Sequence, residues 1–362
     1  MPSTGFSLDS ASVLLVWTAI AIYALAFIAY TIDLSRRSVA AIDAKNAATE
    51  DVRELVGVGA ATASSSASSR GSVETIDQVR ARQERAAEAL TARGSRRDRP
   101  VWARIGTTLT WLGFLFHLAA DVTRGIASGR VPWSNMYEFA LTGTLLIVAV
   151  YLAVLFRYDL RFLGSFITGL IVLLMGGSAV AFYREITPLA DPLKSVWLVV
   201  HVFVASLATA LFALAFALSV LQLMQIRRER RALAAAEAGT AGAKTGPGFL
   251  RLLPSAENLE SLAYRFAIIG FIFWTFTLIA GSIWANDAWG RYWGFDTKEV
   301  WTFVIWVLYA GYIHARATRG WRGTRSAWLS IVGFAAVMFN FTIVNMFFKG
   351  LHAYSGLTTG GS

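Results

Sequence analysis

A segment near the carboxyl-terminal end gathers aromatic rings, cations and acids between two long apolar runs. It reads Trp289-Gly-Arg-Tyr-Trp293-Gly-Phe-Asp296-Thr-Lys-Glu299-Val-Trp301. Anchoring at a membrane interface would explain some of its tryptophans. It does not explain the glycines between the rings, which allow the backbone to approach a ligand closely. Flat aromatic faces in this setting predict a binding platform for a large planar ligand.

The histidines and the absence of thiols narrow the choice of ligand. The chain has four His, six Met and no Cys, so imidazole is the strongest iron ligand that it offers, and thiolate sites and disulfides within the chain are excluded. His201 lies near one end of a predicted membrane helix and His352 directly follows another, both at the level of the Trp-rich segment. A single interfacial His is usually only a solvated amphipathic side chain. Two imidazoles that flank an aromatic platform instead predict a bis-histidine haem site.

Two further histidines lie inside predicted membrane helices, where a polar side chain costs free energy and usually faces the bundle interior. His117 has Asp121 one turn later, a spacing at which a carboxylate can orient the second ring nitrogen. His314 is followed by Arg316 near the helix end, so it could equally reach the headgroup region. These residues alone leave undecided whether a second bis-histidine haem site lies within the membrane.

The charged residues of the Trp-rich segment also allow two interpretations. Arg291 and Lys298 could form charge-assisted hydrogen bonds with haem propionates, or they could be ordinary loop cations. Asp296 and Glu299 have the spacing of a helix capping box, which favours capping over proton chemistry.

The elements that must position these residues are membrane helices. With 56% apolar residues and a mean hydropathy of +0.52 over 362 residues, the chain is typical of an all-α polytopic membrane protein. The first apolar run lacks a basic n-region, which favours an uncleaved helix over a signal peptide. About eight spans are predicted, at residues 12–32, 105–126, 136–156, 162–182, 195–224, 263–285, 300–317 and 326–348.

Basic residues set the predicted orientation, because Lys and Arg concentrate in the loops on one side. This places both termini and the Trp-rich loop outside, and the net charge of +10 mostly on the cytoplasmic surface. No nucleic-acid-binding motif accompanies that charge, so nucleic acid is not an expected partner. The preference for Arg over Lys and the abundance of Ala are typical of a GC-rich bacterial genome rather than an organelle, so the predicted location is the bacterial plasma membrane. The predicted organisation is a first membrane helix (1–32), a mobile cytoplasmic linker (33–104), membrane helices (105–225), a cytoplasmic loop (226–261), membrane helices with the outer Trp-rich loop 285–299 (262–348) and an outer tail (349–362).

Four further motifs accompany the Trp-rich segment. They are Pro132-Trp-Ser-Asn135-Met-Tyr137-Glu138, Trp197-x-x-x-His201-Val, Tyr309-x-x-Tyr312-x-His314-x-Arg316 and Asn345-x-x-x-x-Gly350-Leu-His352-Ala-Tyr354. Together with the segment, which resembles the WWD signature of haem-handling proteins, they resemble the CcsA/ResC family of System II cytochrome c biogenesis, called CcsB in actinobacteria. The resemblance covers roughly residues 105–355.

The resemblance implies roles for individual residues. His201 and His352 would be axial ligands of haem iron at the outer face, and His117 and His314 would ligate haem iron inside the membrane. The outer haem-binding platform would comprise Trp289, Arg291, Tyr292, Trp293, Phe295, Asp296, Lys298 and Trp301. Phe295 stands where the family commonly has Trp, and Thr297 where it commonly has Pro.

The same resemblance implies a membrane subunit of a cytochrome c synthetase, a haem lyase of the holocytochrome c synthase type. It would carry haem b across the membrane and present it for thioether attachment to the Cys-x-x-Cys-His motif of apocytochrome c. Expected partners are a ResB-type membrane protein, apocytochrome c, an upstream thioredoxin-like thiol reductant and the lipid bilayer. No side chain need act as a catalytic nucleophile, because the substrate brings the thiols.

Four alternatives remain open on the sequence. A haem exporter or membrane haem chaperone would share the histidines without attaching haem. A membrane electron carrier would need no Trp-rich outer loop. A scaffold without haem would leave the histidines unexplained, and WWD proteins of the other maturation system differ in their span count and loop lengths.

Overall fold

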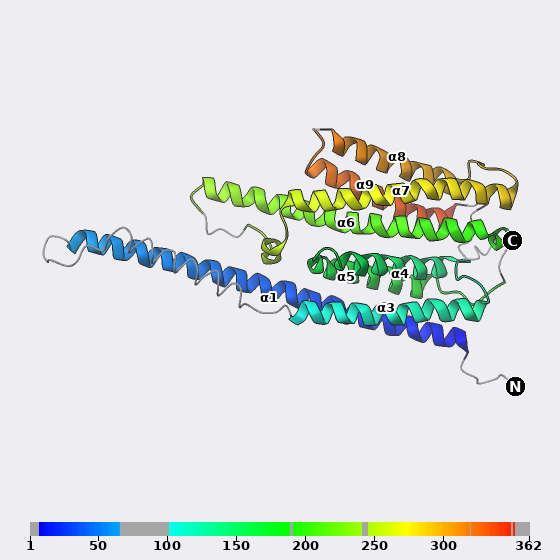
Figure 1. Cartoon of the computed structure of the whole chain (residues 1–362), viewed down its shortest axis with the longest axis horizontal. Helices are drawn as coiled ribbons and strands as arrows, with labels where there is room; N and C mark the ends of the chain where they lie inside the picture. Colours follow the sequence, from blue (N-terminus) through cyan, green and yellow to red (C-terminus); the bar gives the residue numbers. More distant parts are fainter. Residues whose placement is uncertain are drawn as a thin grey trace.

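The computed structural model describes residues 7–65, 101–188, 191–240, 245–318, 320–348 and 350–351, and within them every regular element is helical. The prediction of an all-α polytopic membrane protein is confirmed. The long helices run side by side as one elongated bundle (Figure 1). In chain order the elements are α1 (Leu8–Ser65), α3 (Val101–Ser128), α4 (Met136–Leu155), η1 (Arg161–Leu163), α5 (Gly164–Ala181), η2 (Asp191–Lys194), α6 (Val196–Glu237), η3 (Gly248–Leu252), α7 (Ala256–Trp289), α8 (Thr297–Ala317), α9 (Thr324–Phe339), the π-helix η4 (Asn340–Val344) and α10 (Asn345–Phe347).

Seven helices among the described residues are long and apolar enough to cross a membrane. They correspond to seven of the eight predicted spans. The remaining predicted span, 300–317, lies in α8, a helix of 21 residues. Its Lys298, Glu299, His314 and Arg316 lie at the two ends of α8 and shorten the apolar stretch between them.

Two predicted loop boundaries differ from the structure. The interval 33–104 was expected to be a linker, but α1 continues through its first part to Ser65 and α3 begins at Val101, while residues 66–100 lie outside the described part. Likewise, α6 runs past residue 225 to Glu237. Both extensions are rich in Ala and contain no Pro, which favours continuation of a helix after the apolar run has ended.

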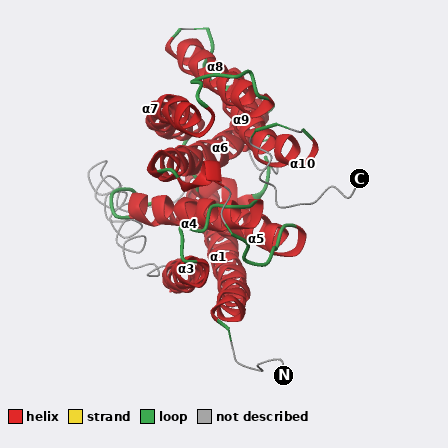
Figure 2. Cartoon of the chain, turned by 90° about the vertical axis from the view of Figure 1, so that its right-hand side faces the viewer, coloured by secondary structure: helices red, strands yellow, loops and turns green. Residues whose placement is uncertain are grey.

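The bundle has two groups of helices that meet along α6. Helix α1 packs on α3 and α5, whereas α6 packs on α4, α7 and α9, and α8 packs on α9 and α7. Figure 2 shows the arrangement from one end, with α3 and α8 at opposite sides and α6 between them. Small residues permit close contact in the first group. A Cβ at Gly106 or Gly164 would lie within 3.0 Å of the Tyr30 ring.

At one end of the bundle α7 ends, the Trp-rich segment follows and α8 begins, so this end is called the Trp-loop end here. It also holds the amino-terminal ends of α4 and α6 and the carboxyl-terminal ends of α3 and α5 (Figure 1). A small apolar cluster of Trp133, Leu193, Leu198, Val202 and Trp284 packs there, separate from the main core. The fold thereby brings His201 and the Trp-rich segment, which are far apart in sequence, to the same end.

Candidate haem site at the Trp-loop end

A cavity of about 480 Å³ opens between α4, α5, α6 and the α9–π-helix segment. This volume falls within the range of small-molecule and cofactor sites. Most of its wall is apolar, and its described lining contains no acidic residue. The polar and aromatic side chains that line it include Phe139, Thr144, Ser178, His201, Ser206, Thr209, Trp274, Trp284, Lys298, Asn340, Thr342 and Asn345.

His201 lies one turn into α6, which begins at Val196 after the Ser195 side chain caps the Trp197 N–H. Its Nδ1 is 2.9 Å from the carbonyl oxygen of Thr277 on α7. A carbonyl only accepts, so Nδ1 carries the proton and Nε2 is the nitrogen with the lone pair. This is the arrangement by which metal-binding histidines fix their tautomer.

Two further contacts hold the His201 ring. Its face stacks on Trp284, with ring centroids 5.8 Å apart and an interplanar angle of 22°. In addition, a Cβ at Gly281 would lie 2.7 Å from Cε1 of the imidazole, which is closer than van der Waals contact allows. Gly281 therefore makes room for the ring at the cavity wall.

The Trp-rich segment is only partly in contact with the cavity. Trp289 packs on Trp284, with centroids 4.9 Å apart, and so stands behind the cavity wall. Arg291, Tyr292, Trp293 and Phe295 are exposed. Phe295 is 80% exposed and has a φ of +56°, an unusual backbone conformation for a bulky residue. Trp301 instead packs on Phe339 of α9.

The capping box predicted at the start of α8 is present. Glu299 Oε2 accepts hydrogen bonds from the N–H groups of Gly294 (2.8 Å) and Asp296 (3.1 Å). Asp296 Oδ1 also accepts from the N–H of Leu351, 3.2 Å away. These two acids therefore shape the Trp-rich segment and tie it to the chain after α10. Leu351 directly precedes His352, which lies outside the described residues.

Lys298 is the cationic residue of the segment that reaches the cavity. Its Nζ donates to Oδ1 of Asn345 at 2.5 Å. Burial lowers the pKa of Lys298 to about 8, an effect that the nearby Asp296 carboxylate partly opposes. The structure thus brings His201 and Lys298 to one cavity, as a haem site with a propionate contact requires.

The two remaining histidines are not brought together. His117 is fully buried on α3, with Nε2 3.0 Å from the Leu141 carbonyl oxygen and Nδ1 3.4 Å from the Tyr23 hydroxyl. Asp121, expected to orient this ring, instead accepts from Thr142 at 3.0 Å. His314 is exposed on α8. Helices α3 and α8 lie on opposite sides of the bundle in both views (Figures 1 and 2), so these imidazoles do not form one site in this chain.

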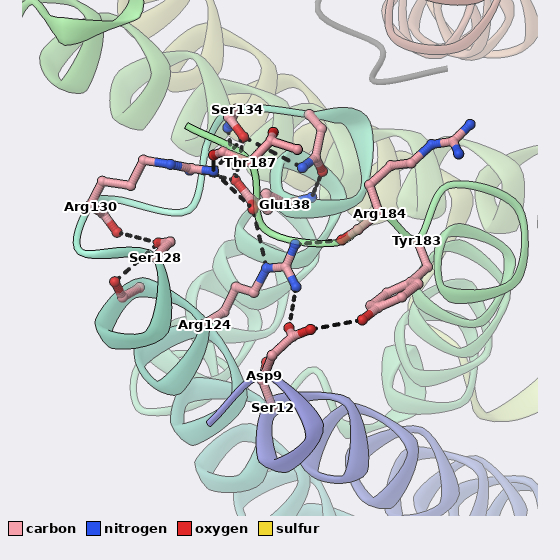
Figure 3. A network of polar contacts seen from close by, with 12 residues as sticks. Asp9, Ser12, Arg124, Ser128, Arg130, Ser134, Glu138, Tyr183, Arg184 and Thr187 are labelled. Atoms are coloured by element: carbon pink, nitrogen blue, oxygen red, sulfur yellow. Dashed lines mark hydrogen bonds and ion pairs between the residues drawn. The ribbon is translucent and has the colours of Figure 1, made fainter. Parts of the chain in front are cut away.

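A buried ion network near the cavity was not predicted as such (Figure 3). Arg124, whose side chain is fully buried, donates to Asp9, to Oε1 of Glu138 at 3.1 Å and to the Arg184 carbonyl at 2.6 Å. Arg130 donates to Oε2 of Glu138 at 2.8 Å. The network joins α1, α3, α4 and the chain after α5, and Glu138 adjoins the cavity residue Phe139.

Asn135 and Glu138 have the spacing of a capping box at the start of α4. The Asn135 side chain does cap the N–H of Glu138 at 3.0 Å. The Glu138 carboxylate, however, accepts from the N–H of Ser134 and from the two arginines rather than closing the box. The sequence did contain one signal for this ion network: Arg124 and Asp9 lie near the ends of apolar runs, where charged side chains require partners.

The fold and the site define a multi-pass helical membrane protein with a histidine- and tryptophan-lined cavity at one end. Residues 133–352 match the family model described as cytochrome C assembly protein. The chain belongs to this family, and its resemblance to the CcsA/ResC proteins of cytochrome c biogenesis is confirmed. It is therefore a membrane protein of cytochrome c biogenesis.

Individual relatives agree with this assignment. The chain is 35% identical over 246 residues to the cytochrome c biogenesis protein CcsA of Guillardia theta, an alignment that covers 65% of this chain and 80% of that protein. It is 33% identical over 282 residues to CcsA of Synechococcus elongatus, covering 69% and 87% respectively. Among solved structures, it is similar to cytochrome c heme lyase CcmF with a TM-score of 0.54 and 15% identity. That alignment covers 94% of this chain but only 48% of CcmF, and it shows a shared fold alone.

Proposed function

We propose that this protein is the membrane subunit of a cytochrome c synthetase and that it holds haem in the cavity at the Trp-loop end for attachment to apocytochrome c. The observation that carries the proposal is the state of His201. Its Nδ1 is committed to the Thr277 carbonyl, and the ring lines a cavity of suitable size. An imidazole fixed in this tautomer presents Nε2 as an iron ligand.

The residues present fit haem by two independent criteria. Gly281 provides the space that the His201 ring occupies, which a Cβ would fill. Lys298 supplies a cation in a wall that is otherwise mostly apolar, as a ring with propionate groups requires. His352, which lies outside the described residues, is the proposed second ligand because the family resemblance implies that role.

The protein's contribution to the reaction is positioning. Ligation by His201 and the aromatic wall would restrict the orientation of the haem ring. Each thiol of a Cys-x-x-Cys-His segment then adds across one vinyl group: sulfur bonds to one carbon and the proton goes to the other. This addition uses no oxidant, provided that the thiols arrive reduced. The chain has no Cys, so the reducing equivalents must come from a separate thiol reductant.

The proposal extends to setting and partners. The distribution of basic residues supports a Trp-loop end that faces outward from a bacterial plasma membrane, with both termini outside. A ResB-type membrane protein is the proposed second subunit, and the substrates are haem b and apocytochrome c. His117 and His314 are not part of the proposed site.

The test is an absorption spectrum of the full chain, purified after co-expression with a ResB-type partner, before and after reduction. We expect low-spin haem in the unmodified protein. His201→Gly should lose this spectrum and recover it when imidazole is added, because free imidazole replaces the missing ligand. His117→Gly is the matched control and should keep the low-spin spectrum. Haem-free protein from a haem-replete host would contradict the proposal.

A second readout separates synthetase from exporter. Covalent haem on a co-expressed apocytochrome c, detected by haem staining after denaturation, should fall in His201→Gly and be restored by imidazole. Haem binding without any covalent product would instead support a haem exporter or chaperone.

A further inference from the structure

The last long helix changes its geometry where it passes the cavity. After α9, residues Asn340–Val344 form a π-helix before α10 resumes the α-helical pattern. The backbone N–H of Asn345 bonds to the Thr342 carbonyl. The Phe341 carbonyl, which an α-helix would pair with that N–H, accepts instead from the Asn345 side chain, Nδ2, at 2.7 Å. This hydrogen bond therefore fixes the conformation of the Asn345 side chain at the end of the π-helix.

This hydrogen bond directs the other end of the Asn345 amide toward α8. Oδ1 of Asn345 accepts from Lys298 Nζ, so the π-helix determines where the ammonium group lies. Both residues line the cavity. Single π-turns of this kind occur frequently at functional sites, because they re-aim side chains at modest cost.

Asn340, at the start of the π-helix, is the most informative member of the group. Its relative exposure is 6%, it lines the same cavity, and its Oδ1 has no hydrogen-bond partner. A buried amide oxygen left unpaired in an apolar wall is unfavourable, which indicates a polar group on the ligand. The amide oxygen and nitrogen exchange places by rotation of the side chain, so the position can donate to a carboxylate.

We propose that Asn340, Asn345 and Lys298 form a carboxylate subsite that binds one propionate of the porphyrin in this cavity. Lys298 supplies the charge, Asn345 holds it in place, and Asn340 supplies a directional hydrogen bond. The inference rests on the proposed function, since it names which side of the cavity receives the carboxylate edge of the ring. A fixed carboxylate edge would place both vinyl groups at the far part of the ring, where the thiols of an apocytochrome must reach them.

The experiment compares two probes on the purified full chain: haemin and haemin dimethyl ester, whose propionates are neutral. Binding is followed by absorbance in the unmodified protein and in Asn340→Leu, Lys298→Met and Thr209→Val. Thr209 lines the cavity from α6 and is the matched control for loss of a polar wall group. We expect Asn340→Leu and Lys298→Met to weaken haemin binding by about tenfold each, and to change ester binding less than about twofold. Thr209→Val should leave the preference for haemin over its ester intact.

Asn340→Asp keeps the size of the side chain and adds a negative charge, so it tests the same position when Asn340→Leu folds poorly. It should weaken haemin more than the ester. Equal affinities of the unmodified protein for haemin and ester, or equal losses for both probes in the variants, would overturn the subsite while leaving the haem site itself standing. Failure of the unmodified protein to bind either probe would overturn the proposed function as well.

Discussion

Gly281 of α7 lies directly against the imidazole of His201 on α6: a Cβ at position 281 would fall 2.7 Å from Cε1 and 2.8 Å from Nδ1 of the ring. The ring also stacks on the indole of Trp284, a residue of the same helix. Its Nδ1 is held by the Thr277 carbonyl, one turn before Gly281 on the same helix. One face of α7 thus determines both the tautomer and the position of the proposed iron ligand.

Gly281→Ala should displace the His201 ring without unfolding the helix, because Ala has a higher helix propensity than Gly. A ligand displaced by about 1 Å no longer meets the geometry that a binding site requires. We expect the haem content of the purified protein to fall by roughly tenfold, with the loss visible in the low-spin absorption bands. Gly311→Ala on α8 is the control, since nothing lies within 4 Å of a Cβ there. Unchanged haem content in Gly281→Ala would show that the ring is not constrained by this contact.

Lys298 should make haemin binding depend on pH. Its pKa is lowered from the ordinary value of 10.5 to about 8, so the ammonium is charged below about pH 8 and is lost as the pH rises. We expect haemin affinity to fall by roughly three- to tenfold between about pH 7 and pH 9. The stability of the ligand-free protein should instead rise with pH between about pH 8 and 10.5. In this range the folded state binds fewer protons than the unfolded state, because the pKa of Lys298 is lower in the folded state. Lys298→Arg stays charged and should remove the decline in affinity; an identical pH profile in that variant would exclude Lys298 as its cause.

Much of the fold was predictable because long apolar runs leave few alternatives. A membrane-length run forms a helix, since every backbone polar group must be paired within it. The same reasoning could not locate the ends of α1 and α6, because Ala-rich helices continue after the apolar pattern stops. Helix α8 also shows the limit of hydropathy, since polar residues at both of its ends shorten its apolar stretch although it packs on α9 and α7 within the bundle.

The residue types of the candidate site were predictable from the sequence, but the side chains and backbone groups that contact them were not. Histidines in an apolar chain and a Trp-rich segment pointed to His201, and the helix topology brought that residue to the Trp-loop end. Thr277, Gly281 and Asn340 carry no signal in one sequence, since each acts through contacts between helices. The structure places His117 on α3 and His314 on α8, on opposite sides of the bundle (Figure 2), and the sequence does not tell which side of the bundle a helix occupies. Their role as haem ligands remains a prediction.

The Arg124 network should be essential for stability at the Trp-loop end. Arg124 is fully buried between Asp9 and Glu138, so Arg124→Met leaves two carboxylates near each other with one cation removed. We expect a loss of about 3–5 kcal/mol in the free energy of unfolding, measured by denaturation in detergent. Arg161→Met is the control, because its partner Asp159 is 73% exposed and such a surface pair contributes about 0–1 kcal/mol. Equal losses of unfolding free energy in the two variants would mean that burial of the network adds nothing to stability.

Phe295 offers a test of whether the Trp-rich segment is kept for function. Its φ of +56° lies in the left-handed region, which costs an L-residue roughly 1–2 kcal/mol relative to Gly, and its ring is 80% exposed. We expect Phe295→Gly to relieve this strain and to raise stability by up to about 1 kcal/mol, since Gly also loses more entropy on folding. The same variant should attach less haem to a co-expressed apocytochrome c, because the platform loses an aromatic face. Gly290→Ala, at a φ of +70°, is the converse control: it should lower stability by about 1 kcal/mol without removing a ring. If Phe295→Gly gained stability and kept full attachment, the ring would have no part in holding haem, and the strain would be a property of the loop alone.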